Sequence, residues 1–212
     1  MAYPWDAGSH ERNWAGYFVP GTAVLRNRLN LWSGEDLRDA ENDLVEARLI
    51  ELRETPELLG ERSYDLVFFQ AIHRQLFQDV YEWAGDLRTV GIEKGSVSFC
   101  PPADIPRPMA HVADRVRELR RLSVVSTEKL PYELAYLYDY VNFAHPFREG
   151  NGRATREFFD LLLSEIGVGL DWHETDLEEL HDACHVARSS SDLASLVRMF
   201  EHIIDSSPAY EY

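Results

Sequence analysis

Apolar residues recur at steps of three and four over most of this 212-residue chain. This is the period at which one face of an α-helix repeats, so the spacing predicts a mainly helical protein. The predicted helices and the residues that define them are 35–53 (Leu37, Ala40, Leu44, Ala47, Ile50), a helix from 66 onward (Leu66, Phe69, Ile72, Leu76, Phe77, Val80), and four later helices marked by Met109, Val112, Val116 and Leu119, by Leu134, Leu137, Tyr138 and Val141, by Phe158, Leu161, Leu162 and Ile166, and by Leu193, Leu196, Phe200 and Ile203.

Polar residues and glycines indicate where some of these helices begin and end. Asp65 is expected to cap the helix that starts at residue 66, and Gly85 to end it. Gly167 is expected to end the helix that contains Phe158. Thr175 with Glu178 has the spacing of a capping box, which predicts a further helix from that point.

One segment departs from the helical period. Between residues 88 and 99 apolar residues alternate on either side of a Glu-Lys-Gly-Ser turn, with Val90 and Ile92 before it and Val97 and Phe99 after it. Alternation with a glycine at the turn, here Gly95, predicts a β-hairpin. No other segment predicts a strand, so the fold class is all-α with one small hairpin, and the alternating strands and helices of a Rossmann or barrel fold are excluded.

The first residues of the chain are rich in aromatic side chains, including Trp5, Trp14, Tyr17 and Phe18. Such residues predict an arm that packs on the body of the protein rather than a disordered tail. We therefore expect residues 1–60 to form an arm and a helix that pack on a main domain at 61–205, the whole being one structural unit.

The chain is strongly acidic, with a net charge of −16 and a pI of about 4.8. This charge argues against direct nucleic-acid binding, because the protein would repel the phosphate backbone. It is explained either by solubility alone or by a basic partner that covers part of the surface. There is no apolar run of the roughly 20 residues that a membrane span needs and no signal-peptide pattern, and Cys100 and Cys184 do not resemble a disulfide framework. We expect a cytoplasmic protein.

The densest chemistry lies in HPFREGNGRATREF, residues 145–158. The glycines of 150–152 allow successive N–H groups to face one concavity, and the helix that starts near Arg153 adds its dipole, so the loop is a candidate anion site. Arg153 and Arg156 are three residues apart and are expected to reach from the same side of that helix. Glu149 suits Mg²⁺ better than phosphate, and His145 can accept a proton near neutral pH.

Each of these features alone has an ordinary structural explanation. A Gly-Asn-Gly sequence before a helix is usually only a turn, and a histidine before proline is more often structural than catalytic. Their combination within twelve residues is much harder to explain by packing. The loop is therefore predicted to bind a phosphate group beside a metal-binding acid and a base.

The same residues resemble the complete motif of the Fic proteins, HPF-x-[D/E]-GNGR-x-x-R, without a departure. The YEWAG-x-x-R sequence at 81–88, the hairpin and the N-terminal PGT-x-VLRN are also similar to cell-filamentation members of the family, so the resemblance covers most of the chain. It identifies 61–205 as a Fic (Fido) domain and implies the Fic fold. In this resemblance Phe147 anchors the loop in the core.

The resemblance implies transfer of AMP from ATP to a Ser, Thr or Tyr hydroxyl of a target protein, with release of pyrophosphate. His145 would deprotonate the hydroxyl, and Glu149 would hold Mg²⁺ between the α- and β-phosphates. Asn151 would orient the α-phosphate, and Arg156 would contact the nucleotide or brace an acid. The residues assigned to ATP and phosphate are Gly150, Asn151, Gly152, Arg153 and Arg156.

The hairpin resembles the flap of Fic proteins, which pairs main chain to main chain with an extended target segment. The flap residues are Ile92, Glu93, Lys94, Gly95 and Phe99. Doc-type relatives, with lysine in place of the second glycine, phosphorylate their targets, and phosphocholine-transferring relatives alter the residue before the asparagine. Gly150 and Gly152 favour AMP transfer, while a phosphotransferase or a nucleotide-gated binding module remains an alternative.

Many Fic proteins are silenced by a helix with the motif [S/T]-x-x-x-E-[G/N]. Only Glu41-Asn42 and Glu149-Gly150 place Asn or Gly after Glu here, and Leu37 and His145, four residues earlier, are not hydroxyl residues. The resemblance therefore points to the class that is inhibited by a separate small antitoxin, whose glutamate would contact Arg156. A type II topoisomerase subunit is the implied candidate target.

The remaining candidates have structural readings. His181 and His185 lie one helical turn apart, but no third zinc ligand is evident. Cys184 is expected to be a small buried residue and His73 a structural one. The basic cluster Arg115, Arg117, Arg120 and Arg121 is expected to be a solvated helix face, because acids surround it.

Overall fold

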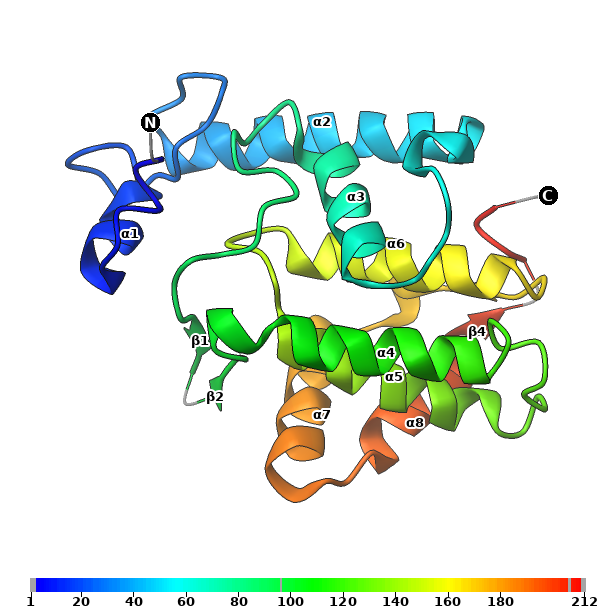
Figure 1. The fold of residues 1–212 in the computed structure, drawn as a ribbon. Coiled ribbons are helices and arrows are strands. Elements are labelled where there is room, and N and C mark those ends of the chain that lie inside the picture. Colours follow the sequence, from blue (N-terminus) through cyan, green and yellow to red (C-terminus); the bar gives the residue numbers. More distant parts are fainter. Residues whose placement is uncertain (1–2, 96, 206, 211–212) are drawn as a thin grey trace.

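The structure is a computed structural model that describes residues 3–95, 97–205 and 207–210, and it is mainly helical (Figure 1). The helices are α1 (His10–Gly16), α2 (Gly34–Glu54), α3 (Leu66–Phe77), α4 (Pro106–Glu118), α5 (Leu130–Ala144), α6 (Asn151–Ser164), α7 (Leu177–Ser190) and α8 (Ala194–Ile203). Short 3₁₀ turns lie at Pro56–Leu59, Pro102–Asp104 and Trp172–Glu174. Two-residue strands are β1 (Glu93–Lys94), β2 (Val97–Ser98), β3 (Gly169–Leu170) and β4 (Ile204–Asp205).

The helices stack in layers around α5 and α6. In Figure 1, α2 runs across the top of the molecule and packs on α3, which packs on α6. Helix α5 contacts α6 on one side and α4, α7 and α8 on the others. Helices α5 and α6 are consecutive, and the loop at 145–150 joins these two central helices. The predicted all-α class is confirmed.

Helix α2 exposes part of the face that its sequence predicted to be buried. Ala47 and Ile50 are exposed, whereas Glu41, Val45 and Leu52 are buried. The apolar pattern counted Glu41 as a surface residue. The Glu41 carboxylate instead points to partners inside the protein. The buried face of α2 is therefore rotated relative to the predicted one.

Helix α3 begins where it was predicted to begin, because Asp65 accepts a hydrogen bond from the Phe68 N–H. It ends at Phe77, well before Gly85. Gly85 serves a different contact: its φ is +82°, and a Cβ there would lie 2.8 Å from the Cβ of Arg74. The chain leaves the helix and returns against its side, and only glycine fits that approach.

Other boundaries also differ from the prediction. Helix α6 starts at Asn151 rather than Arg153, and Asp176, not Thr175, caps α7 by accepting from the N–H groups of residues 178 and 179. A second antiparallel pair joins β3 to β4, with Gly169 opposite Asp205. It was missed because two-residue strands are too short to show a period.

The predicted hairpin is present, with Glu93 opposite Ser98 and Lys94 opposite Val97. Gly95 has a φ of +62°, as its place in the turn requires. The ladder is shorter than the predicted 88–99 segment: the Phe99 N–H still donates to the Ile92 carbonyl across the hairpin, but the Arg88 and Cys100 N–H groups donate to Pro146 and Phe143 of the main body. Residue 96 lies outside the described residues.

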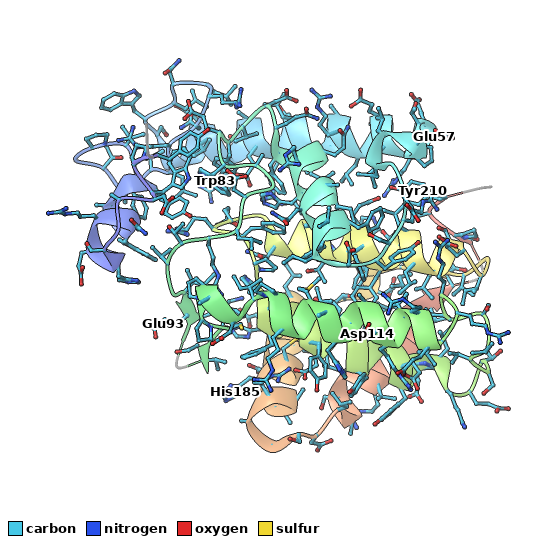
Figure 2. All side chains as sticks on the ribbon, viewed as in Figure 1. Glu57, Trp83, Glu93, Asp114, His185 and Tyr210 are labelled. Atoms are coloured by element: carbon cyan, nitrogen blue, oxygen red, sulfur yellow. The ribbon has the colours of Figure 1, made fainter. Side chains whose placement is uncertain are left out.

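The N-terminal arm packs on the main body. Trp5 and Tyr17 are buried, and Tyr17 meets the ring of Trp83 edge to face. Trp83 is labelled in Figure 2. Trp14 is exposed, and the Arg148 guanidinium lies over its ring. Among the described residues, no helix is long and apolar enough to cross a membrane.

Candidate active site

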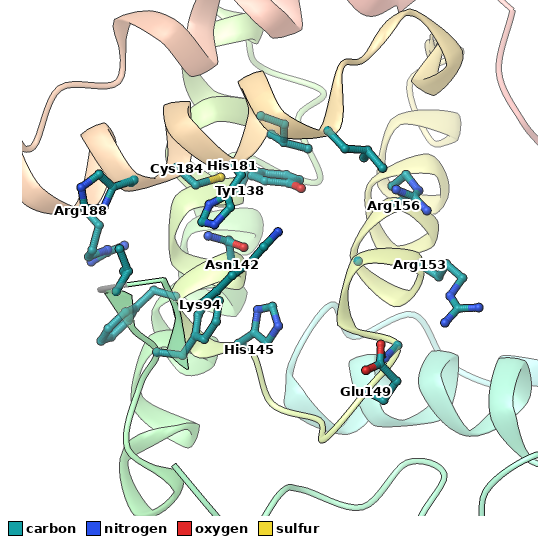
Figure 3. A pocket seen from close by; sticks show the side chains of 18 of the residues that line it. Lys94, Tyr138, Asn142, His145, Glu149, Arg153, Arg156, His181, Cys184 and Arg188 are labelled. Carbon is teal, nitrogen blue, oxygen red and sulfur yellow. The ribbon is translucent and has the colours of Figure 1, made fainter. Parts of the chain in front are cut away.

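A cavity of about 540 Å³ opens where α5, α6, α7 and the hairpin meet (Figure 3). His145 lies on one side of it, and Arg156 and Gly152 from α6 lie on the other. Glu149 stands at the lower edge in this view. The cavity lining brings several cationic side chains together, although the whole chain has a net charge of −16. This local positive charge suits an anionic ligand.

His145 follows the last residue of α5 and takes a left-handed conformation, with a φ of 39° and a ψ of 59°. Such a conformation is uncommon for residues with a side chain and turns the chain sharply out of the helix. The ring stacks on Phe99 of the hairpin, with the centroids 3.8 Å apart. Burial, with the nearby charge of Arg88, lowers the pKa of His145 to about 3. The imidazole is therefore neutral and can accept a proton.

Phe147 and His73 hold the loop in the core; the sequence predicted this for Phe147 and only a structural role for His73. Phe147 is fully buried, and its ring centroid lies 3.8 Å from that of His73. His73 Nε2 lies 2.9 Å from the Glu149 carbonyl oxygen, and its Nδ1 accepts the Gly85 N–H at 2.8 Å. Accepting at Nδ1 requires that Nε2 carry the proton and donate. Burial lowers the pKa of His73 to about 3, which keeps this tautomer neutral.

Asn151 closes the loop from its other end. Its Oδ1 accepts the Phe147 N–H at 2.9 Å, and its Nδ2 donates to the Phe147 carbonyl at 2.8 Å. Both polar groups of this buried amide are used by one residue four positions earlier. The side chain holds the loop in shape rather than reaching into the cavity.

The two glycines of the loop meet different surroundings. Gly150 has a φ of +81°, and a Cβ on it would lie 2.4 Å from the Phe77 ring. Gly152 has a negative φ and open space around the position of a Cβ. Gly150 is thus required by the packing of the loop on α3. Gly152 leaves the first turn of α6 uncovered, where backbone N–H groups lack intrahelical acceptors.

The two arginines of α6 both line the cavity but have different partners. Arg153 turns away from His145 in Figure 3 and forms an ion pair with Glu41 of α2. Its guanidinium also lies over the Phe77 ring, 4.8 Å from the centroid. Arg156 lines the cavity and has no hydrogen bond or ion pair to any side chain that the structure describes.

Glu149 supplies an oxygen donor of the type that Mg²⁺ prefers. Its side chain is exposed at the cavity, and Oε1 accepts the Gly150 N–H at 3.0 Å. The described residues contain no group of three or more His, Cys, Asp and Glu side chains arranged to hold a metal. A single carboxylate fits Mg²⁺, because this ion usually keeps several waters and takes its other ligands from substrate phosphates.

Comparison with known proteins agrees with this geometry. The Fic/DOC family model matches residues 63–163. The curated "Probable protein adenylyltransferase Fic" of Salmonella typhimurium is 34% identical over 188 residues, which cover 89% of this chain and 91% of that protein. The chain belongs to the Fic/DOC family.

More distant Fic relatives cover similar parts of the chain. "Protein adenylyltransferase VbhT" of Bartonella schoenbuchensis is 32% identical over 164 residues, 77% of this chain and 34% of VbhT. The crystal structure of BepC protein from Bartonella tribocorum, solved with bound AMPPNP, matches with a TM-score of 0.82 and 22% identity over 90% of this chain and 97% of that one. This structural likeness confirms the Fic fold.

Arg88 is a buried support of the Fic loop to which the sequence assigned no role. Its Nε donates to the His145 carbonyl at 2.8 Å and its Nη1 to the Val90 carbonyl at 2.7 Å, and Nη2 donates to Cys100. Its main-chain N–H donates to the Pro146 carbonyl at 2.8 Å. Burial lowers the pKa of Arg88 to about 10, so the side chain stays charged. Its place in YEWAG-x-x-R was the available signal.

Arg148, the variable residue of the Fic motif, joins the loop to the N-terminal arm. Its guanidinium lies 4.5 Å from the Trp14 ring centroid and 5.3 Å from that of Phe18. Burial lowers its pKa, and its Nε has no hydrogen-bond partner within the described chain. Aromatic faces therefore supply much of the stabilisation of this cation. No local pattern could have paired residues so far apart.

The residues predicted to form the flap lie in or next to the hairpin, and their binding of a target stays a prediction. Lys94 and Phe99 line it, and Phe99 connects the hairpin to His145. Ile92 and Glu93 line a second groove, of about 720 Å³, on the side of the hairpin that faces α1. The first strand thus separates the cavity from a groove that is open to solvent.

The other histidines and cations fit structural readings. His181, Cys184 and His185 come from α7 and line the cavity wall (Figure 3). Cys184 is buried, as expected. In the basic cluster, Arg115 pairs with Glu133 and Glu118, Arg117 with Asp114, and Arg121 with Glu165. Arg115 and Arg117 lie on α4 with acidic partners, as predicted for a helix face. Arg120 and Arg121 follow the end of α4 at Glu118, with φ values of 45° and 52°, so the prediction of one helix face was wrong for these two.

Proposed function

We propose that this Fic protein is a protein adenylyltransferase that transfers AMP from ATP to a Ser, Thr or Tyr hydroxyl of a target protein. The observation that carries the proposal is the position of His145. Its neutral imidazole faces a cavity whose opposite wall is the uncovered first turn of α6 with Arg156. A base on one side and an anion site on the other are the two elements that a phosphate-transfer reaction needs.

In the proposed reaction the target hydroxyl loses its proton to His145 as its oxygen attacks the α-phosphorus. The bond from the α-phosphorus to the oxygen that bridges the α- and β-phosphates breaks, and pyrophosphate leaves. The pKa of His145 near 3 in the free protein makes it a weak base. Negative phosphate charge in the cavity would raise that pKa, so nucleotide binding strengthens the base.

Phosphate binding falls mainly to the start of α6. The N–H groups of Asn151 and Gly152 and the Arg156 guanidinium are the proposed donors, while the Gly150 N–H donates to Glu149 and Gly150 contributes through the shape of the loop. The Asn151 side chain is occupied by Phe147. Its proposed contact with the α-phosphate is therefore made by the main-chain N–H, while the amide group keeps the loop in the required shape.

Glu149 is the proposed Mg²⁺ ligand. Bound between phosphate oxygens, the ion would neutralise charge on the pyrophosphate leaving group. The hydrogen bond from Gly150 N–H to Oε1 orients the carboxylate and leaves Oε2 for the ion. The flap residues Ile92, Glu93, Lys94, Gly95 and Phe99 are proposed to hold the target segment beside His145.

We propose that regulation comes from a separate antitoxin, which makes this chain the toxin of a pair. The chain lacks the inhibitory motif, and Arg156 is free to receive a partner's glutamate. The domain division at residues 60 and 61, a cytoplasmic location and a type II topoisomerase subunit as target belong to the same proposal. Unchanged AMP transfer after addition of the purified antitoxin would contradict the toxin role.

Labelled nucleotides separate the proposed reaction from the alternatives. A bacterial lysate is incubated with the protein and ATP labelled at either the α- or the γ-phosphate. Protein-bound label from the α-position alone supports AMP transfer, and label from the γ-position alone supports a phosphotransferase. Absence of label from both, with ATP still bound, supports a nucleotide-gated binding module. Mass spectrometry of the labelled band then identifies the target.

A further inference from the structure

Helix α2 contributes a buried carboxylate to the phosphate side of the site. Glu41 is 7% exposed, and its Oε1 accepts a hydrogen bond from Arg153 Nη2 in an ion pair. Glu41 lies outside the segment that matches the Fic/DOC model, residues 63–163. An acid in contact with an arginine of the phosphate loop therefore comes from a part of the chain to which no function is assigned.

Glu41 is held in place from its other oxygen. Tyr81 donates its hydroxyl to Oε2, and the Tyr81 ring stacks on Trp83 with the centroids 4.2 Å apart. Tyr81 is 1% exposed. A carboxylate fixed at both oxygens has one orientation, and it imposes that orientation on the guanidinium bound to it.

The opposite face of Arg153 is also fixed. The Phe77 ring lies 4.8 Å below the guanidinium and is the same ring that packs on Gly150. Arg153 Nη1 lies 3.5 Å from Asn42 Oδ1. A guanidinium has five N–H donors. Each of these two acceptors takes one donor in the structure, so three N–H groups of Arg153 are without an acceptor among the described residues and can serve a phosphate.

The position of Glu41 relative to the cavity shows whether its carboxylate competes with a phosphate or orients Arg153. Asn42 and Arg153 line the cavity, whereas Glu41 does not. Both Glu41 oxygens are covered by their donors. The carboxylate therefore does not occupy the space of a phosphate; it lies behind the arginine and directs it.

We propose that Glu41 is a positioning residue for ATP, which holds Arg153 in the orientation that binds the phosphates. The inference rests on the proposed function in one respect, that the loop at 145–156 binds ATP. Tyr81 and Phe77 complete the support. In this view α2 is part of the active site, and the near-match Glu41-Asn42 to an inhibitory motif has the opposite effect.

The test compares two ligands that share a nucleoside and differ in phosphate. Calorimetry measures binding of AMPPNP with Mg²⁺, and of adenosine, to full-length wild type and to Glu41→Gln. The variant keeps the size of the side chain and loses its charge. We expect AMPPNP affinity to fall about tenfold, the weight of one charge-assisted hydrogen bond, and adenosine affinity to stay unchanged. Tyr81→Phe should reproduce the pattern with a smaller loss.

Two further variants make the result specific. Glu51→Gln removes an acid from the same helix that pairs with Arg48 away from the cavity, and it should change neither affinity. In an Arg153→Met background, Glu41→Gln should cause no further loss of AMPPNP affinity, because the residue through which Glu41 acts is gone. Thermal unfolding curves confirm that each variant is folded.

Several results would overturn the inference. Equal losses for AMPPNP and adenosine would make Glu41 merely structural. Unchanged AMPPNP affinity would leave it no role, and tighter AMPPNP binding would show that it competes with phosphate. Wild type that fails to bind AMPPNP would remove the premise. Wild type that binds AMPPNP but labels no protein from α-labelled ATP would contradict the proposed transfer reaction and leave the role of Glu41 standing.

Discussion

Arg88 donates its Nε–H to the carbonyl oxygen of His145 at 2.8 Å, so a fully buried cation holds the residue that carries the proposed base. The same guanidinium donates to Val90 and Cys100 at the two ends of the hairpin. One side chain therefore fixes the flap relative to the proposed catalytic loop.

Arg88→Lys should loosen the attachment of the hairpin to the loop that contains His145. A single ammonium group cannot reach all of the carbonyls that the planar guanidinium serves, and each buried carbonyl left without a donor costs about 1–3 kcal/mol. Urea denaturation should show a lower free energy of unfolding, and the kcat of AMP transfer should fall more than ATP affinity does. Arg117→Lys, at an exposed ion pair, is the control. Wild-type kcat in Arg88→Lys would contradict this role.

His145→Ala should abolish AMP transfer while leaving ATP binding intact. A positioned general base contributes about 10²–10⁴-fold to the rate, and the anion site on α6 does not depend on the imidazole. Transfer is measured with α-labelled ATP and binding by calorimetry. Transfer retained at more than a tenth of the wild-type rate would refute the role of His145 as base.

In the free protein, His145 should stay neutral at mildly acidic pH, so its protonation should not reduce its capacity to accept a proton. Its pKa is lowered to about 3, so the neutral form, which is the form that accepts a proton, is already complete at pH 5. The imidazole C–H signals of His145, assigned by their loss in His145→Ala, should not shift between pH 5 and 8 in the absence of nucleotide. A titration centred near pH 6.5 would contradict the burial seen here.

The loop could be predicted from the sequence, but its supports could not. His145, Glu149, Gly150, Gly152 and Arg156 lie within twelve residues, so their proximity follows from the chain itself. Glu41, Phe77 and Arg88 reach the loop or its arginines from other segments, and Arg148 within the loop contacts the distant N-terminal arm. A single sequence contains no signal for contacts over such separations. The misplaced face of α2 has the same origin, because the polar residue it buries has its partner on α6.

Alanine substitution should lower stability at one motif glycine and not at the other. Gly150→Ala places a methyl group 2.4 Å from the Phe77 ring at a φ of +81°, and should lower the free energy of unfolding by more than about 1 kcal/mol. Gly152→Ala meets open space and should leave stability nearly unchanged or slightly higher. Urea denaturation of both variants checks this. Equal stability of the two would contradict the packing described.

His73→Phe should destabilise the loop although it keeps an aromatic ring against Phe147. The Glu149 carbonyl and the Gly85 N–H both lose their partner in a buried place, which predicts a loss of about 2–4 kcal/mol in the free energy of unfolding. His111→Phe, at an exposed position, should cost much less. ATP affinity should fall with His73→Phe, since the loop loses a fixed point. An unchanged unfolding midpoint would refute the proposed support.

The raised pKa of Glu157 predicts that the free energy of unfolding falls as pH rises. Burial raises its pKa to about 8, from 4.5 in the unfolded chain, and Tyr210 donates its hydroxyl to the carboxyl group. Between these values the folded protein holds a proton that the unfolded chain has lost, so stability falls as pH rises, by at most about 1.4 kcal/mol per pH unit.

Glu157→Gln should remove this contribution. The difference in unfolding free energy between wild type and the variant, measured by urea denaturation at pH 5.5, 7 and 8.5, should move in favour of the variant as pH rises. Taking the difference cancels the opposite trend of His73 and His145, whose lowered pKa values reduce stability as pH falls from 6.5 toward 3. Glu201→Gln, an exposed acid on α8, should show no such trend. A pH-independent difference would contradict a protonated Glu157.

The attachment of the hairpin to the loop has a consequence for target choice. Because Arg88 fixes both ends of the hairpin to the main chain around His145, the distance from the strand edge to the imidazole is constant. A target segment that pairs with this edge places its residues at set intervals of about 3.3 Å along the strand. With the proposed flap role, we expect the modified hydroxyl to be chosen by its position along the bound segment rather than by the identity of its neighbours.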